Sequence, residues 1–185
     1  MTLPVQTDWP IAPPITIYLG LGANLGDREA NLSHALALLA PQCGPFVCSS
    51  IYEAPPWGDV DQPPFLNLVA RGQTRLALPA LLDHVQAVER RVGRTPGRRW
   101  GPRVVDVDIL AYGKAVIAEP GIEVPHPRLH ERGFVLVPLA ELSPDWRHPR
   151  LGNSAADLLA ALPPEETTGI RRWGAPLAPD ARTVE

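Results

Sequence analysis

The chain has 185 residues, 45% of them hydrophobic, and a formal net charge of −3. A chain of this length and apolar content can bury one substantial core, so we expect a single domain. The mildly acidic balance argues against a protein that coats a polyanion along its surface. Cys43 and Cys48 are the only cysteines. They lack the spacing of a zinc ribbon or a CxxC redox motif, so we interpret both as reduced structural residues.

The two ends of the chain differ in character from its middle. Residues 1–14 contain four prolines and no basic residue, which predicts a flexible arm and argues against a signal peptide or a membrane span. The residues after Gly174 also have the character of a loose tail. We therefore expect a flexible arm at residues 1–14, one domain at residues 15–173, a flexible tail at residues 174–185 and a cytoplasmic protein.

The first half of the domain predicts three strands and one helix. Ile15–Leu21 is the first strand, and the helix that follows is capped by Asp27 and ends near Pro41. Phe46–Tyr52 and Phe65–Thr74 are the second and third strands. The proline-rich connection between them is too long for a tight hairpin.

The second half begins with an amphipathic helix at Leu78–Val92, and a fourth strand follows at Val104–Tyr112. Beyond it we expect a short hairpin within Val116–Val124, a helix or a strand at Arg132–Ala140, and a short helix at Ala155–Leu162. The order strand, helix, strand, strand, helix, strand is the split βαβ pattern of ferredoxin-like domains. The predicted fold is therefore of the α+β class, an antiparallel sheet with helices packed on its faces, plus a C-terminal extension.

Two acids of the fourth strand form the sharpest chemical signal. In the segment VVDVDIL, strand periodicity places Asp106 and Asp108 on one face and the valines and isoleucine on the other. Magnesium prefers such hard oxygen ligands and often takes only one or two carboxylates. A bare pair of this kind is more often the solvated face of a strand. The nearby arginines favour a metal-nucleotide site instead, because guanidinium groups bind phosphate oxygens in a forked geometry. They are Arg90, Arg91, Arg94, Arg98, Arg99 and Arg103.

A second group of residues suggests a pocket for a flat ring. Phe65 and Asn67 share a strand face, one offering an aromatic plate and the other an amide, and Phe134 or Trp57 could lie opposite. A core role for Phe65 is the simpler interpretation from the strand alone. His126, between two prolines, and Arg132 form another polar cluster, for which a surface loop is the simpler interpretation.

Two familiar nucleotide motifs are absent. Gly20-Leu-Gly22 follows a strand, but a dinucleotide fingerprint requires glycine where this chain has Leu25. Gly113-Lys114 fails as a P-loop, because the preceding glycine is replaced by aspartate and the hydroxyl residue by Ala115. A nucleotide in this chain would be bound by other means.

Four ordered segments resemble the hydroxymethyldihydropterin pyrophosphokinase family from about residue 16 to residue 149: YLGLGANLGDR, SSIYEAPPWGDVDQPPFLNLV, RRVGRTPGRRWGPRVVDVDILAYG and VPHPRLHERGFVLVPLAEL. The combination of RWGPR with DxDIL is the most specific part. The resemblance implies transfer of pyrophosphate from ATP to the hydroxymethyl group of 6-hydroxymethyl-7,8-dihydropterin, with release of AMP, in folate biosynthesis. It implies two Mg²⁺ ions. We also expect a monomer with neither a nucleic-acid nor a membrane partner.

The resemblance also implies the residues of the site. The catalytic residues would be Arg94, Arg103, Asp106 and Asp108, with the two aspartates as the metal ligands. ATP would be bound by Gln86, Glu89, Trp100, Arg103, His126 and Arg132. The pterin would be bound by Ala54, Pro56, Trp57, Phe65, Asn67 and Phe134. Ala54 departs from the threonine common in the family, and the arginine loop is one residue shorter than in some relatives, so Arg98 has no secure counterpart.

Two other functions compete with this interpretation. A split βαβ sheet with an arginine-rich loop could bind RNA, but the strands lack the aromatic RNA-binding pattern and the net charge is negative. A metal-dependent nuclease would also use paired carboxylates, but it would not explain Phe65 and Asn67. Release of AMP only in the presence of a pterin would separate the three.

Overall fold

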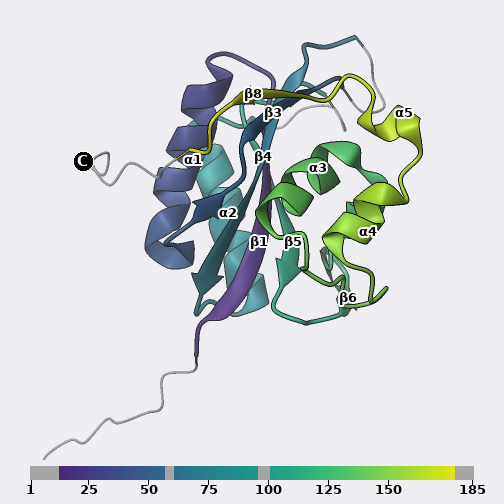
Figure 1. Ribbon diagram of the computed structural model, residues 1–185. Helices are drawn as coiled ribbons and strands as arrows, with labels where there is room; N and C mark the ends of the chain where they lie inside the picture. The colour runs from purple at the N-terminus through teal and green to yellow at the C-terminus, as the bar shows by residue number, and fades with distance from the viewer. Residues whose placement is uncertain (1–12, 57–60, 96–100, 178–185) are drawn as a thin grey trace, which may run out of the picture.

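The computed structural model describes residues 13–56, 61–95 and 101–177. Its centre is an antiparallel sheet in the order β5-β1-β4-β3-β8, with β2 also paired to β4 (Figure 1). Read by the order of its strands along the chain, this is the ferredoxin-like arrangement predicted from the sequence. The strands of the sheet are β1 (Ile15–Ala23), β2 (Val47–Cys48), β3 (Ile51–Ala54), β4 (Phe65–Thr74), β5 (Asp106–Tyr112) and β8 (Arg171–Gly174).

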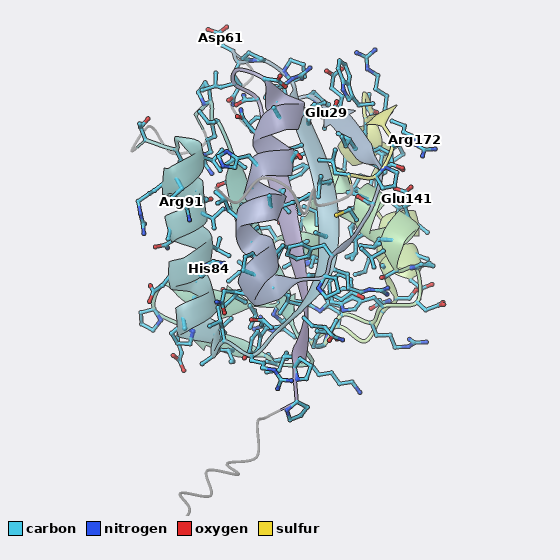
Figure 2. All side chains as sticks on the ribbon, turned by 90° about the vertical axis from the view of Figure 1, so that its left-hand side faces the viewer. Glu29, Asp61, His84, Arg91, Glu141 and Arg172 are labelled. Carbon is cyan, nitrogen blue, oxygen red and sulfur yellow. The ribbon has the colours of Figure 1, made fainter. Side chains whose placement is uncertain are left out.

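Two crossover helices, α1 (Arg28–Cys43) and α2 (Leu78–Val92), cover one face of the sheet (Figures 1 and 2). The Asp27 side chain caps α1 by accepting a hydrogen bond from the Ala30 N–H at 3.1 Å. The helix runs on past Pro41, where we expected it to end, because the last turn still closes with a hydrogen bond from the Gly44 N–H to Ala40. The core on this face includes Ile17, Leu19, Leu21, Leu36, Leu39, Leu81, Val85 and Val88.

The other face is covered by helices that follow the fourth predicted strand (Figure 1). The segment that the sequence left open as a helix or a strand is α3 (Gly133–Leu142), and it is followed by α4 (Ala155–Ala160) and the short α5 (Pro164–Thr167). Their core includes Tyr18, Val69, Leu110, Val135, Leu136 and Leu139. Because both faces of the sheet are covered, the open platform that an RNA-binding sheet would need is absent from the described residues.

The predicted second strand is interrupted. Instead of one strand at Phe46–Tyr52, the chain forms β2 and β3, separated by Ser49 and Ser50. The Ser49 N–H donates to the Val69 carbonyl at 2.9 Å, and its hydroxyl accepts from the Val69 N–H at 3.0 Å. Ser50 donates its N–H and its hydroxyl to Glu141 of α3, at 3.0 and 2.7 Å. These side-chain contacts replace ladder bonds, so the strand is split.

The C-terminal extension contains a strand that the sequence analysis did not predict. β8 pairs antiparallel with β3 and so covers an edge of the sheet. The hairpin expected after β5 is confirmed as β6 (Ile117–Glu119) and β7 (Ile122–Val124), and a short 3-10 turn follows at Leu129–Glu131. The predicted boundaries of the arm, the domain and the tail stay predictions, since residues 1–12 and 178–185 lie outside the described residues. No helix in the described part of the chain has the length and apolar character needed to cross a membrane.

Candidate active site

Two glycines of β1 form the floor of a cavity. Gly22 lies between Asp106 of β5 and Asn67 of β4, and Gly20 lies between Asp108 and Val69. A Cβ atom at Gly22 would lie 3.0 Å from Asn67 Oδ1. The absence of side chains at these positions therefore leaves a hollow of roughly 300 Å³, the lower end of the range for small-molecule sites. Its lining includes Gly20, Gly22, Pro55, Gln62, Phe65, Asn67, Gly101, Arg103, Asp106, Asp108, His126, Arg132 and Phe134.

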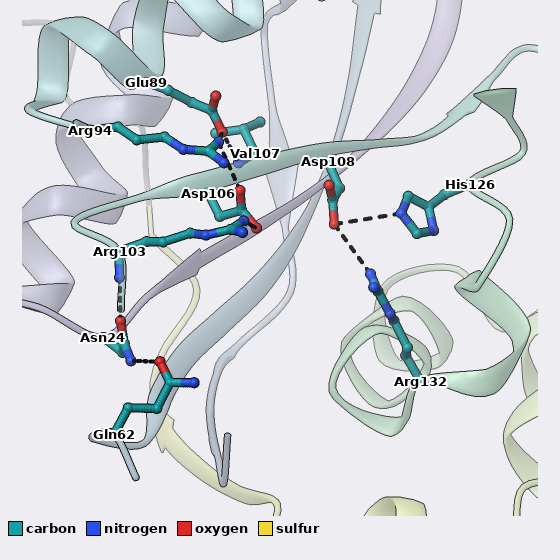
Figure 3. A network of polar contacts seen from close by, with 10 residues as sticks. All are labelled: Asn24, Gln62, Glu89, Arg94, Arg103, Asp106, Val107, Asp108, His126 and Arg132. Atoms are coloured by element: carbon teal, nitrogen blue, oxygen red, sulfur yellow. Dashed lines mark hydrogen bonds and ion pairs between the residues drawn. The ribbon is translucent and has the colours of Figure 1, made fainter. Parts of the chain in front are cut away.

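Asp106 is the first residue of β5 and is held by two arginines. Arg94 Nη1 lies 2.9 Å from Asp106 Oδ1, and Arg103 Nη1 lies 2.6 Å from Asp106 Oδ2 (Figure 3). All three side chains are partly exposed. Each carboxylate oxygen thus has its own guanidinium partner, which is a strong form of charged hydrogen bond.

Glu89 lies behind this group on α2. Its buried Oε1 accepts two hydrogen bonds, one from the Val107 N–H at 2.8 Å and one from Arg94 Nη1 (Figure 3). Burial raises the pKa of the Glu89 carboxyl, although the Val107 N–H and Arg94 oppose the rise. Glu89 therefore fixes β5 to α2 and orients Arg94 toward Asp106.

Asp108 lies one step further along the same strand face. Arg132 Nη1 is 3.4 Å from Asp108 Oδ2, and His126 Nε2 is 3.9 Å from the same oxygen (Figure 3). The Asp108 side chain is 37% exposed, but that exposure is into the cavity, where protein on several sides limits hydration. Burial and then the negative charge of Asp106 raise the pKa of Asp108 to about 6.

His126 presents a hydrogen-bond donor to the cavity. The Arg128 N–H donates to His126 Nδ1 at 3.2 Å, so Nε2 carries the hydrogen of the neutral ring. Burial and the charge of Arg132 lower the pKa of His126 to about 4. The ring is therefore neutral at pH 7, with its N–H on the side of Asp108.

The other half of the cavity is less charged. Phe65, Asn67 and Phe134 all line it, and the guanidinium carbon of Arg132 lies 5.5 Å from the centroid of the Phe134 ring. Asn67 is buried, and its amide is directed by a 3.5 Å contact to the Phe65 carbonyl. Pro55 completes this side. Two aromatic rings and a buried amide at one end of the cavity suit a flat polar heterocycle.

Asn24, at the turn between β1 and α1, joins the two chain segments that border the cavity. Its backbone N–H donates to the Arg103 carbonyl at 3.0 Å, and its Oδ1 accepts from the Arg103 N–H at 2.7 Å. Its Nδ2 donates to Gln62 Oε1 at 3.0 Å and to the Pro63 carbonyl at 3.1 Å (Figure 3). A single buried side chain thus connects the segment before β4 with the segment before β5.

The structure gathers most, but not all, of the residues predicted for the site. Glu89 and Arg94 do not line the cavity but support Asp106 from behind. Gln86 is exposed on α2 and Ala54 is buried within β3, and neither lines the cavity; Pro56 does not line it either, although its neighbour Pro55 does. Trp57 and Trp100 lie outside the described residues, as does Arg98. Those that line the cavity are Phe65, Asn67, Arg103, Asp106, Asp108, His126, Arg132 and Phe134.

Several residues that build the site could not be identified, or were not, from the sequence. Gly20 and Gly22 were weighed only as part of a dinucleotide motif, whereas two glycines at alternate positions of a strand are a recognisable sign of close approach on one face. Gln62 gave no signal, because its partner Asn24 is distant in the sequence.

Comparison with known proteins places this arrangement in a family. A model of the family described as 7,8-dihydro-6-hydroxymethylpterin-pyrophosphokinase (HPPK) matches residues 18–144. The chain is 44% identical over 157 residues to a 2-amino-4-hydroxy-6-hydroxymethyldihydropteridine pyrophosphokinase of Methylorubrum extorquens, covering 84% of this chain and 96% of that one. It is 46% identical over 127 residues to the protein of that name from Bacillus subtilis, covering 68% of this chain and 76% of that one.

Solved structures show the same fold. A Plasmodium falciparum HPPK-DHPS chain with pteroate superimposes with a TM-score of 0.65 at 15% identity, over 80% of this chain and 43% of that one. The wild-type form of that protein gives the same TM-score at 16% identity, over 80% of this chain and 44% of that one. The present chain thus spans less than half the length of these solved chains. The family match and the close sequence relatives together show that this chain belongs to the 7,8-dihydro-6-hydroxymethylpterin-pyrophosphokinase family.

Proposed function

We propose that the chain transfers the pyrophosphoryl group of ATP to the hydroxymethyl group of 6-hydroxymethyl-7,8-dihydropterin, as the names of its close relatives indicate. The observation that carries the proposal is that one cavity has paired acids and arginines on one side and two phenylalanines with a buried amide on the other. A phosphate chain with its metal suits the first side, and a pterin ring suits the second.

Asp106 and Asp108 would hold two Mg²⁺ ions. Their carboxylates project from alternate positions of β5 into the cavity, and two hard oxygen groups are the ligand set that magnesium takes when substrate phosphates and water supply the rest. No group of three or more acids, histidines or cysteines suited to a metal occurs in residues 13–56, 61–95 and 101–177. When bound, magnesium would neutralise the charge that develops on the phosphate oxygens.

The arginines have a second use in this scheme. Arg94, Arg103 and Arg132 pair with the two aspartates in the protein alone. Once these carboxylates serve as metal ligands, the guanidinium groups are available to phosphate oxygens, which they bind in a forked geometry. The neutral His126 adds an Nε2–H donor beside them. These groups would hold the triphosphate in line with the attacking hydroxyl.

On the other side, Phe65 and Phe134 would hold the pterin ring between them and the Asn67 amide would bind its polar edge. Ala54, Pro56 and Trp57 stay predicted pterin contacts, the first two through backbone groups. The hydroxymethyl oxygen then forms a bond to the β-phosphorus as the bond from that phosphorus to the α-phosphate oxygen breaks. AMP leaves with that oxygen, and the hydroxyl proton passes to solvent. Alignment matters more here than a strong base.

The experiment that tests the proposal measures AMP formation from ATP and magnesium, with and without the pterin. We expect AMP only when all three are present. Asp108→Ala should abolish that turnover with little loss of stability, because it removes a partly exposed acid. Full activity in this variant would contradict the metal assignment. AMP formation that does not need the pterin, or nucleotide release from nucleic acid, would instead support the nuclease interpretation.

The cellular setting and the assembly state also stay proposals. We infer a cytoplasmic enzyme that acts as a monomer.

A further inference from the structure

Arg28, the first residue of α1, contacts three separate segments of the chain. Its Nη1 donates to Glu53 Oε1 of β3 at 3.0 Å and to the Pro64 carbonyl, just before β4, at 2.8 Å. Its guanidinium carbon lies 5.0 Å from the ring centroid of Trp173 in β8, a distance suited to a cation–π contact. Arg28 itself is only 20% exposed at its side chain.

Glu53 is the centre of this cluster. Its side chain is 9% exposed and also accepts a hydrogen bond from Arg171 Nε of β8 at 2.9 Å. Burial alone would raise the pKa of Glu53, but the hydrogen bonds from Arg171 and Arg28 outweigh it, and the pKa is lowered. Glu53 is therefore an ionised, buried acid held between two arginines.

The cluster lies where β3 and β4 separate. In the ladder Glu53 pairs with Leu66, and Ala54 pairs with Phe65. Pro55 follows the last paired residue of β3, and Pro64 precedes the first paired residue of β4. Arg28 thus bridges the two strand ends from which Pro55 and Phe65 reach the cavity.

Arg28 acts from the face of the sheet opposite the cavity. Glu53 shares a strand face with Ile51, which belongs to the core under α1 and α2. Phe65 and Asn67 lie on the other face of β4 and line the cavity. The Arg28 guanidinium cannot touch a ligand in the cavity, so any influence on a ligand passes through the backbone of β3 and β4.

We propose that Arg28 is a positioning residue for the pterin half of the cavity, bridging Glu53 and the Pro64 carbonyl so that Pro55 and Phe65 keep the separation that the ring needs. This inference rests on the proposed function. It also gives β8, which lies beyond the residues matched by the family model, a part in the reaction. β8 contributes Arg171, which donates to Glu53, and Trp173, whose ring lies against the Arg28 guanidinium.

The test is a comparison of Michaelis constants in Arg28→Ala. Because a hydrogen bond to a charged group and one to a carbonyl are both lost, we expect KM for the pterin to rise about tenfold. KM for ATP and kcat should stay within about twofold of the wild type, because Asp106, Asp108 and their arginines lie on other segments. Arg28→Lys, which keeps the charge and a donor, should restore most of the loss.

Arg147→Gln provides a matched control. Arg147 Nη1 also donates to a backbone carbonyl, that of Gly152 at 3.0 Å, and it does not line the cavity. We expect neither KM to change in this variant. A rise of both KM values together in Arg28→Ala, or an unchanged KM for the pterin, would overturn the inference.

Failure of the inference can be told apart from failure of the proposed function. A wild-type protein that forms no pterin-dependent AMP overturns the proposed function and this inference with it. An active wild type with an unaltered KM for the pterin in Arg28→Ala overturns the inference alone. Should Arg28→Ala fail to fold, Arg171→Ala is measured in the same way, because Arg171 holds the Glu53 partner of Arg28. A rise in KM for the pterin alone then supports the inference, and an unchanged KM for the pterin refutes it.

Discussion

Replacing Gly22 by alanine should separate binding from stability. Gly22 is not among the described glycines with positive φ, so alanine fits the strand backbone and reduces the entropy of the unfolded chain, a gain of about 0.4–1 kcal/mol. The new methyl group would lie 3.0 Å from Asn67 Oδ1 and 3.7 Å from Phe65 Cδ1. The Asn67 amide must then turn away by a few tenths of an ångström, which would weaken the hydrogen bond that we propose it makes to the pterin.

The expected size follows from that one bond. A hydrogen bond contributes about 1 kcal/mol, and the floor of the cavity is also raised, so KM for the pterin should increase roughly five- to tenfold. Stability should stay the same or rise slightly. Damage to the fold would raise KM and lower the stability together. A higher KM for the pterin with unchanged or higher stability therefore excludes that explanation.

The measurements are steady-state KM values and thermal or denaturant unfolding of the same preparations. Gly174→Ala is the matched control, because its Cβ would meet only the end of Ile51 at 3.7 Å, an ordinary contact, outside the cavity. It should gain similar backbone stability with no change in KM. An unchanged KM for the pterin in Gly22→Ala would refute the assignment of Gly22 and Asn67 to the floor of the pterin site.

Three further predictions concern other parts of the chain. Asn24→Ala removes side-chain hydrogen bonds to both segments that border the cavity, so KM should rise for ATP and for the pterin together, in contrast to Arg28→Ala; a change in only one would contradict the bridging role. Since the folded pKa of Glu53 lies below its unfolded value, its contribution to stability is present above the unfolded pKa and is lost as pH falls through the folded pKa. Glu53→Gln should therefore flatten the acid side of the curve of unfolding free energy against pH, and an unchanged curve would argue against the ionised cluster. Burial raises the pKa of Cys43 and of Cys48 to about 11, so both thiols should react with iodoacetamide at pH 8 only when the protein is unfolded; rapid labelling of the native protein would disprove this.

Features that depend on local periodicity could be predicted from the sequence. The alternation around Asp106 and Asp108 placed both acids on one face, and the apolar spacing of residues 78–92 predicted the bounds of α2. Helix periodicity did not predict that Gln86, an expected ATP contact, would be exposed. It lies three residues from Glu89, which on a helix leaves about 60° between the two directions, and that is enough to expose Gln86 while Glu89 is buried.

Features that depend on distant partners could not be predicted. The split of the second strand results from Ser50 and Glu141, which lie 91 residues apart. The pairing of β8 with β3 and the contacts of Arg28 with Glu53 likewise join segments whose local sequence gives no sign of one another. The Ala54 side chain is buried at a paired position of β3 and does not line the cavity, so its predicted contact with the pterin, through backbone groups, stays a prediction.

The two faces of the sheet have different roles in the site. One carries residues that line the cavity, and the other carries residues that fix the same strands to the helices. On β5, Asp106 and Asp108 face the cavity, whereas the backbone of Val107 between them is fixed by Glu89 from the helix side. On β3 and β4, Phe65 and Asn67 face the cavity, whereas Glu53 is fixed by Arg28 from the same helix side. The cavity-facing residues at the start of β5 and of β4 therefore each have a charged residue on the opposite face of the sheet, Glu89 and Arg28 respectively. Substitutions on the cavity face should alter the chemistry or the binding directly. Substitutions of the supports should act through geometry, on one substrate at a time: Glu89 on the phosphate side and Arg28 on the pterin side.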